Sequence, residues 1–143
     1  MTTPTSIPPF HLAFPVRDLD EARAFYGILL GCNEGRSTAQ WVDFNFFGHQ
    51  LVAHLCPTQG SDAPKSLVDG REVPASHFGA VVPRERWQAM ADALSNHRIK
   101  FIIEPHVRFQ GLPGEHATMF FRDPSGNAIE MKSFKDLDQL FAK

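Results

Sequence analysis

The chain has 143 residues, of which 43% are hydrophobic and 21% are charged, and its formal net charge is −2. These values are typical of one globular domain, or of two small fused modules. Because there is no block of like charges, the sequence argues against nucleic acid or a membrane surface as the main partner. No apolar run approaches the roughly 20 residues that span a bilayer.

Two ratios in the composition stand out. There are 13 Phe beside 1 Tyr, and 7 His beside 2 Cys. Cys32 and Cys56 form no C-x-x-C motif and are too few for a disulfide scaffold, and no secretory leader is seen. We therefore expect reduced thiols and a cytoplasmic protein.

Hydrophobic periodicity predicts the elements of the first half in chain order. A buried strand is followed by a helix that Asp18 caps and Gly31 ends. Two half-buried strands joined by a tight turn come next. The three strands are expected at 10–16, 41–47 and 50–56. The first module is thus expected at 8–56, and the stretch 57–74, rich in Pro, Gly and small polar residues, is expected to be a connector.

The same order of elements follows the connector. A buried strand leads into a helix that starts near Pro83 and carries Trp87, Met90, Ala91 and Leu94 on one face. Further strands are expected at 101–103, 117–122 and 128–134, with a polar loop at 104–115. The second module is placed at 75–135, its first strand at 76–82, and a tail or short helix at 136–143. We expect one α+β domain made of two modules.

Both modules begin with a strand that carries a histidine at the same place, His11 and His77. Because strand side chains alternate between faces, each histidine shares its face with small residues. The bulky face is expected to pack on the helix. On the closing strands, His54 and Glu130 point away from the helix in the same manner. If the two sheets pair, these four groups converge on one cavity.

Two imidazoles and one carboxylate on one face form a facial triad that leaves open positions on an octahedral metal, as suits non-haem Fe(II). Mn, Ni, Co and Zn are also compatible with such a site. The alternative is that each strand histidine is a packed or hydrogen-bonded residue and that the glutamate is a paired surface group. Periodicity alone does not choose between the two interpretations.

Three segments carry a resemblance to a known family: Phe10-His-Leu-Ala-Phe-Pro-Val-Arg-Asp-Leu-Asp-Glu-Ala-Arg-Ala-Phe-Tyr, Ser76-His-Phe-Gly, and Phe121-Arg-Asp-Pro-Ser-Gly-Asn-Ala-Ile-Glu-Met. The chain resembles the vicinal oxygen chelate superfamily of glyoxalase I, bleomycin-resistance proteins, fosfomycin-resistance enzymes and extradiol dioxygenases. Within it, the stretch 41–54 is most similar to small predicted extradiol-type dioxygenases.

The resemblance implies paired βαβββ modules whose curved mixed sheets surround a metal cavity. It implies metal ligands at His11, His77 and Glu130, and a divalent metal, with Fe(II) or Mn(II) first and Zn, Ni or Co as alternatives. It also implies a homodimer, in which the cavity forms within one chain or by exchange of modules between two chains.

The chain departs from well-studied extradiol enzymes at one position. Those enzymes place a tyrosine on the strand before the metal glutamate, where this chain has Thr118-Met-Phe-Phe, and its one tyrosine, Tyr26, lies on the first helix. We therefore assign proton transfer to His54 or His116, with His54 as an alternative fourth metal ligand and a solvated loop position as the alternative for His116.

The sequence is compatible with three functions. The first is an extradiol-type dioxygenase that acts with O2 on a small substrate with adjacent oxygens. The second is non-redox isomerisation or thiol transfer of the glyoxalase type on the same scaffold. The third is a protein that binds a small molecule or antibiotic without metal.

Overall fold

The computed structural model describes residues 7–58, 65–68 and 70–143. The chain divides into two compact units, 1–59 and 60–143, which are taken one at a time below. None of the described helices is long and apolar enough to cross a membrane.

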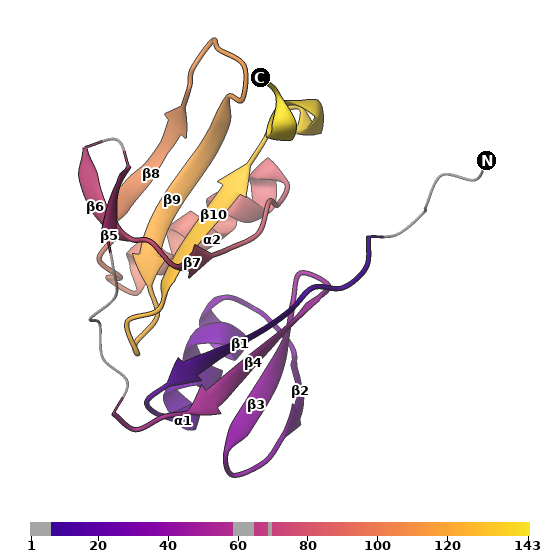
Figure 1. Ribbon diagram of the computed structural model, residues 1–143, viewed down its shortest axis with the longest axis vertical. Coiled ribbons are helices and arrows are strands. Elements are labelled where there is room, and N and C mark those ends of the chain that lie inside the picture. The colour runs from indigo at the N-terminus through magenta and orange to yellow at the C-terminus, as the bar shows by residue number, and fades with distance from the viewer. Residues whose placement is uncertain (1–6, 59–64, 69) are drawn as a thin grey trace, which may run out of the picture. The chain divides into compact units, whose positions relative to one another are not determined.

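Unit 1 is a four-stranded mixed sheet with one helical segment on one face (Figure 1). Its strands stand in the order β1-β4-β3-β2, with β1 parallel to β4 and the other pairs antiparallel. The strands are β1 (His11–Val16), β2 (Glu34–Ser37), β3 (Trp41–Phe46) and β4 (His49–Leu55).

The predicted first helix is confirmed, and its hydrogen bonding changes along its length. It begins as α1 (Leu19–Ala22), where the Asp18 carboxylate accepts from the backbone N–H of Glu21. It continues as the π-helix η1 (Arg23–Leu29). The backbone N–H of Leu30 donates to the carbonyl of Phe25, five residues back. The wider turn brings Phe25 and Tyr26 into the core of the unit.

Tyr26 is the centre of that core. Its ring lies 5.3 Å from Phe14, 5.1 Å from Phe25 and 5.5 Å from Phe44, measured between centroids, and it is completely buried. Edge and tilted contacts of this kind add to the stabilisation that burial itself provides. The one tyrosine of the chain is therefore a core residue.

Unit 2 repeats the topology of unit 1. Its four-stranded sheet has the order β7-β10-β9-β8, again with the first and last strands parallel, and it carries a helix on one face (Figure 1). The elements are β7 (His77–Phe78), α2 (Arg84–Asn96), β8 (Ile103–Arg108), β9 (His116–Arg122) and β10 (Ala128–Ser133). The predicted internal repeat, in which each half has a strand, a helix and then further strands, is confirmed, and in the structure each half has three strands after the helix.

Helix α2 packs on the sheet through the predicted face, since Trp87, Met90, Ala91 and Leu94 are all buried. The indole N–H of Trp87 donates to the carbonyl of Met131 on β10 at 2.9 Å. Met119, Phe121, Ile129 and Met131 are completely buried. Because side chains alternate, their neighbours on β9 and β10 point to the opposite face of the sheet.

The structure contains three strands that sequence patterning missed. Strand β2 has an exposed edge-strand pattern without apolar alternation. Arg23 of η1 donates to Glu34 of β2, and this hydrogen bond raises the pKa of Arg23. The hairpin of β5 (Lys65–Val68) and β6 (Arg71–Pro74) lies in the expected connector. Val73 of β6 is buried with Ile103 and Phe120, so an apolar contact joins β6 to the core of the unit.

Two boundaries also differ from expectation. Strand β8 runs through Arg108, so part of the expected loop 104–115 is paired with β9. The expected strand 76–82 is interrupted after Phe78, and pairing resumes at Val81 opposite Lys132. At the interruption, the backbone of Gly79 approaches the carbonyl of Glu130 so closely that a Cβ there would overlap the carbonyl oxygen.

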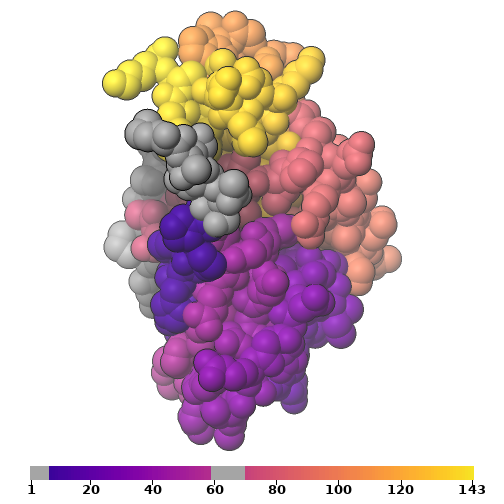
Figure 2. All heavy atoms as spheres, turned by 90° about the vertical axis from the view of Figure 1, so that its right-hand side faces the viewer, coloured from indigo at the N-terminus to yellow at the C-terminus, as the bar shows by residue number. Residues whose placement is uncertain are grey.

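The last described element is a 3-10 helix, η2 (Leu137–Phe141), so of the two alternatives expected for 136–143 the structure has the short helix. The side chain of Gln139 accepts from the backbone N–H of Gly114, in the loop between β8 and β9. Figure 2 shows these last residues, in yellow, against the orange surface of that loop.

Candidate metal centre

The two strands of unit 2 that carry predicted ligands are paired in parallel. Ala128 of β10 is the register partner of His77 on β7, and Glu130 follows two residues later on the same face. The Nε2 atom of His77 and the Oε1 atom of Glu130 are 3.5 Å apart. The structure thus brings together two of the three predicted ligands.

The remaining polar atoms of this pair are already engaged. His77 Nδ1 lies 3.1 Å from the carbonyl oxygen of Pro74, so in the neutral imidazole Nδ1 carries the proton and Nε2 presents a lone pair. The Thr118 hydroxyl donates to Glu130 Oε2 at 2.5 Å. Nε2 and Oε1, which face one another, are atoms of the kind that can bind a divalent cation.

Glu130 is 8% exposed, and its neighbours define the chemistry of this face. The ammonium group of Lys132 lies 3.9 Å from Oε1 and provides positive charge. The ring of Phe120 meets the His77 imidazole edge-on at 5.0 Å and provides an apolar wall. A buried carboxylate needs such compensating partners because desolvation disfavours its charged form.

The third predicted ligand, His11, lies in unit 1 at the start of β1. It is the register partner of Gln50 on β4, and its Nδ1 atom lies 2.8 Å from Gln50 Oε1. Across the described part of the chain, no group of three His, Cys, Asp or Glu side chains is close enough to hold a metal ion. Among the described residues, a metal at the His77–Glu130 pair would therefore have no third side chain of these types within reach.

The register corrects the expected correspondence between His54 and Glu130. Because His11 pairs with Gln50 and His77 pairs with Ala128, the counterpart of Glu130 in unit 1 is Val52. His54 stands two residues further along β4 and is paired with Pro15 and Trp41. It is about 13 Å along the strand from Gln50, since a strand rises about 3.3 Å per residue. This separation argues against His54 as a co-ligand of His11.

His116 is not a solvated loop residue, because it begins β9 and is 4% exposed. Its ring stacks on Phe134 at 4.8 Å, and its Nδ1 atom lies 2.7 Å from the carbonyl of Gly114. Nε2 is buried and has no hydrogen-bond partner among the described residues. His116 also stands four residues before Phe120, the register partner of Glu130, which again is about 13 Å along the strand.

The other histidines have local roles. His49 accepts from the backbone N–H of Phe10, and His97 caps the end of α2 with its Nδ1 atom 2.9 Å from the carbonyl of Ala93. His106, expected in a loop, lies in β8.

Sequence reasoning missed three residues of this site. Gln50 and Lys132 stood on the expected face, but nothing in their type marked them as contacts of His11 and Glu130. The sequence marked Thr118 only by its place in the strand where extradiol enzymes have a tyrosine, and it indicated no contact for the Thr118 hydroxyl. The register of β9 against β10, which alternation does not define, places its hydroxyl at Glu130.

Comparison with known proteins identifies the family. Residues 9–131 match the model of the glyoxalase/bleomycin resistance protein/dioxygenase superfamily. A crystal structure of a glyoxalase/bleomycin resistance protein/dioxygenase from Alicyclobacillus acidocaldarius is similar, with 34% identity, 99% of each chain covered and a TM-score of 0.78. No curated protein matches the chain.

Two more distant structures share the fold. One is a mutant of the fosfomycin resistance protein FosX from Listeria monocytogenes, complexed with Mn(II) and a dihydroxypropylphosphonic acid (17% identity, 94% and 96% covered, TM-score 0.69). The other is a lactoylglutathione lyase from Agrobacterium tumefaciens (20% identity, 98% of each chain covered, TM-score 0.61). With the repeated topology and the family match, the chain belongs to the glyoxalase/bleomycin resistance protein/dioxygenase superfamily.

Proposed function

We propose that this protein is a divalent-metal-dependent enzyme that acts on a small substrate with two adjacent oxygens. The observation that carries the proposal is the pair of His77 Nε2 and Glu130 Oε1, 3.5 Å apart. Their other polar atoms are engaged by Pro74 and Thr118. Such an arrangement fits a metal site better than a packed histidine, because it leaves two donor atoms facing one another.

His11 is the proposed third ligand, supplied by unit 1 of the same chain or of a second copy in a homodimer. Two imidazoles and one carboxylate suit Fe(II) or Mn(II) and leave positions open for a chelating substrate. The Mn(II) bound by the Listeria protein supports this choice of metal. The low cysteine count, 2 in 143 residues, supports the cytoplasm as the location.

A cation bound there would act as a Lewis acid toward negative charge on the substrate oxygens. Around it, Thr118 holds the Glu130 carboxylate in place, and Lys132 attracts an anionic oxygen. Phe120 offers an apolar surface beside His77 for the body of the substrate. Proton transfer by His54 or His116 stays a prediction. On its own sheet, each of them lies about 13 Å along the strand from the register partner of a proposed ligand, Gln50 for His54 and Phe120 for His116.

Extradiol cleavage of a catechol is the first reaction to test, in which both atoms of O2 enter the ring-opened product. A non-redox reaction of the glyoxalase or fosfomycin-resistance type is the second candidate, and one observation favours it. Thr118 and Phe120 occupy the positions of β9 that face Glu130, and Tyr26 is buried in unit 1. No tyrosine is thus available to an extradiol apparatus.

The test is metal analysis combined with turnover. The purified protein is stripped of metal, reloaded with Fe(II) or Mn(II), and assayed with catechols in air and with 2-oxoaldehyde thiol adducts and epoxides without O2. We expect one equivalent of metal per chain, and its loss in His77→Ala and Glu130→Gln. His97→Ala, which changes only a helix cap, is the matched control. Full metal binding by both ligand variants would overturn the proposal, and O2 consumption separates the two reactions.

A further inference from the structure

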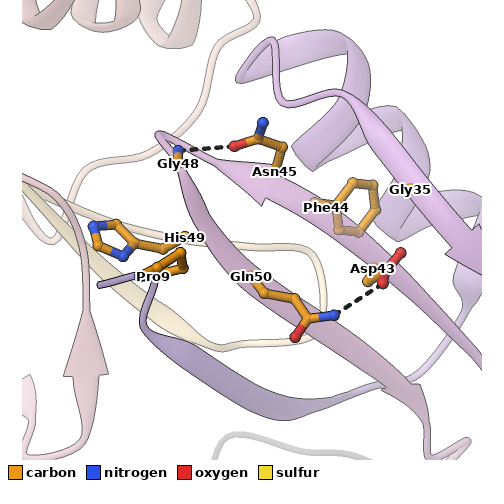
Figure 3. Close-up of a pocket in the computed structure, with 8 residues that line it drawn as sticks. All are labelled: Pro9, Gly35, Asp43, Phe44, Asn45, Gly48, His49 and Gln50. Atoms are coloured by element: carbon orange, nitrogen blue, oxygen red, sulfur yellow. Dashed lines mark hydrogen bonds between the residues drawn. The ribbon is translucent and has the colours of Figure 1, made fainter. Parts of the chain in front are cut away.

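A buried carboxylate lies on the ligand-bearing face of unit 1. Asp43 of β3 is 7% exposed and is the register partner of Val52, on the same face as His11 and Gln50. It borders a pocket of about 280 Å³ that Gln50, His49 and Pro9 also line (Figure 3). A buried carboxylate in a wall of this kind requires a hydrogen-bond donor.

Gln50 supplies that donor. Its amide nitrogen lies 3.1 Å from Asp43 Oδ2, whereas Oδ1 accepts no hydrogen bond from any described residue. Gly35 of β2 closes over Oδ1, since a Cβ at this position would lie 2.6 Å from it. Because an ionised carboxylate only accepts, the amide nitrogen of Gln50 has to point toward Asp43.

The orientation of the Gln50 amide determines which of its two atoms, nitrogen or oxygen, faces His11. Figure 3 shows the amide nitrogen of Gln50 turned toward Asp43 and its oxygen turned away. That oxygen lies 2.8 Å from His11 Nδ1. An amide oxygen only accepts, so Nδ1 of neutral His11 must carry the proton and Nε2 must present the lone pair.

We propose that Asp43 and Gln50 are positioning residues that act in series on His11: the carboxylate orients the amide, and the amide holds the imidazole in the Nδ1–H tautomer with Nε2 ready to bind metal. This inference rests on the proposed function for its use, but not for its geometry. Ligating histidines usually have the other ring nitrogen held by a carboxylate or carbonyl, and here an amide stands between carboxylate and ring.

The repeat supports the assignment. In unit 2, the backbone carbonyl of Pro74 favours the same Nδ1–H tautomer for neutral His77. Among the described histidines, His11 is the one whose Nδ1 meets a side-chain oxygen. Its tautomer can therefore be changed by substitutions elsewhere, whereas that of His77 cannot.

The experiment is ¹⁵N NMR of the histidine rings in the metal-free protein above pH 8, where neutral imidazole dominates. We expect His11 as the Nδ1–H tautomer in the wild type. In Gln50→Leu the acceptor is lost, and in Asp43→Asn the amide of Gln50 is free to invert, so both variants should gain the Nε2–H form. His77, whose carbonyl acceptor remains, should not change.

Metal affinity is the second readout. Loss of an outer partner of a ligand typically weakens metal binding 10- to 100-fold, so titration with Mn(II) should give about a 10-fold loss in Asp43→Asn and more in Gln50→Leu. Asp92→Asn is the matched control, because Asp92 also accepts from a glutamine amide, that of Gln88, but on the exposed surface of α2. The Mn(II) affinity of the Asp92→Asn variant should be unchanged.

The outcomes separate the two proposals. If His11 is in the Nε2–H form in the wild type, or if Asp43→Asn leaves its tautomer unchanged, the relay is overturned whatever the metal does. If the tautomers follow the prediction but neither the wild type nor any variant binds metal, the relay stands as a structural fact and the proposed function fails. Thermal unfolding of each variant confirms that the comparison is between folded proteins.

Discussion

At the scale of single residues, the two ligand-bearing faces hold their functional groups by different kinds of partner. Backbone carbonyl and threonine hydroxyl hold His77 and Glu130, whereas side chains alone hold His11. A backbone partner persists through substitution, whereas the hydrogen bond that Glu130 Oε2 accepts comes from a replaceable side chain, the hydroxyl of Thr118.

Thr118→Val tests that group because valine keeps the shape and removes the donor. A hydrogen bond to a charged group contributes about 1.5–3 kcal/mol, and Thr118 is 1% exposed, so no water replaces it there. We expect the free energy of unfolding, measured with urea, to fall by this amount, and Mn(II) affinity to fall about 10-fold. Thr118→Ser keeps the hydroxyl and should keep the affinity, losing only about 0.8 kcal/mol for a buried methyl group. Equal affinity in the valine and serine variants would contradict this role.

At the scale of elements, the parallel pairing of β7 with β10 depends on the absence of a side chain at Gly79. A Cβ there would lie 1.5 Å from the carbonyl oxygen of Glu130. This is backbone, which cannot move aside as the end of a flexible side chain can. The close approach lies where the pairing of β7 is interrupted and directly beside the backbone of Glu130.

We therefore expect Gly79→Ala to destabilise the protein by about 3 kcal/mol and to weaken Mn(II) binding by displacing Glu130. Gly27→Ala is the control, because a Cβ at Gly27 would meet its nearest atoms at ordinary distances of 3.8 and 3.9 Å. Within a helix that exchange should be neutral or stabilising by up to about 1 kcal/mol. The denaturation midpoints of the two variants measure this difference. A Gly79→Ala protein as stable as Gly27→Ala would contradict the predicted cost of a side chain at Gly79.

The elements also show how much of the fold and of the candidate site can be predicted from the sequence alone. The face of each ligand strand followed from alternation, and the repeat was visible because His11 and His77 open strands of similar pattern. What alternation cannot provide is register between strands. That is why His54 seemed equivalent to Glu130 and Thr118 had no assigned contact. Strands β2, β5 and β6 were missed because edge and hairpin strands carry polar residues that resemble loops.

At the scale of the whole molecule, the proposed ligands belong to both units, so metal binding should stabilise the protein as a whole. A ligand present at 100 times its dissociation constant adds about 2.7 kcal/mol, which for a chain of this length raises Tm by roughly 8 °C. We expect Mn(II) to produce such a shift in the wild type and in His97→Ala, measured by calorimetry. The shift should disappear in His77→Ala, which alters unit 2, and equally in His11→Ala, which alters unit 1. A full shift in His11→Ala would mean that unit 2 binds metal by itself and that His11 is not a ligand.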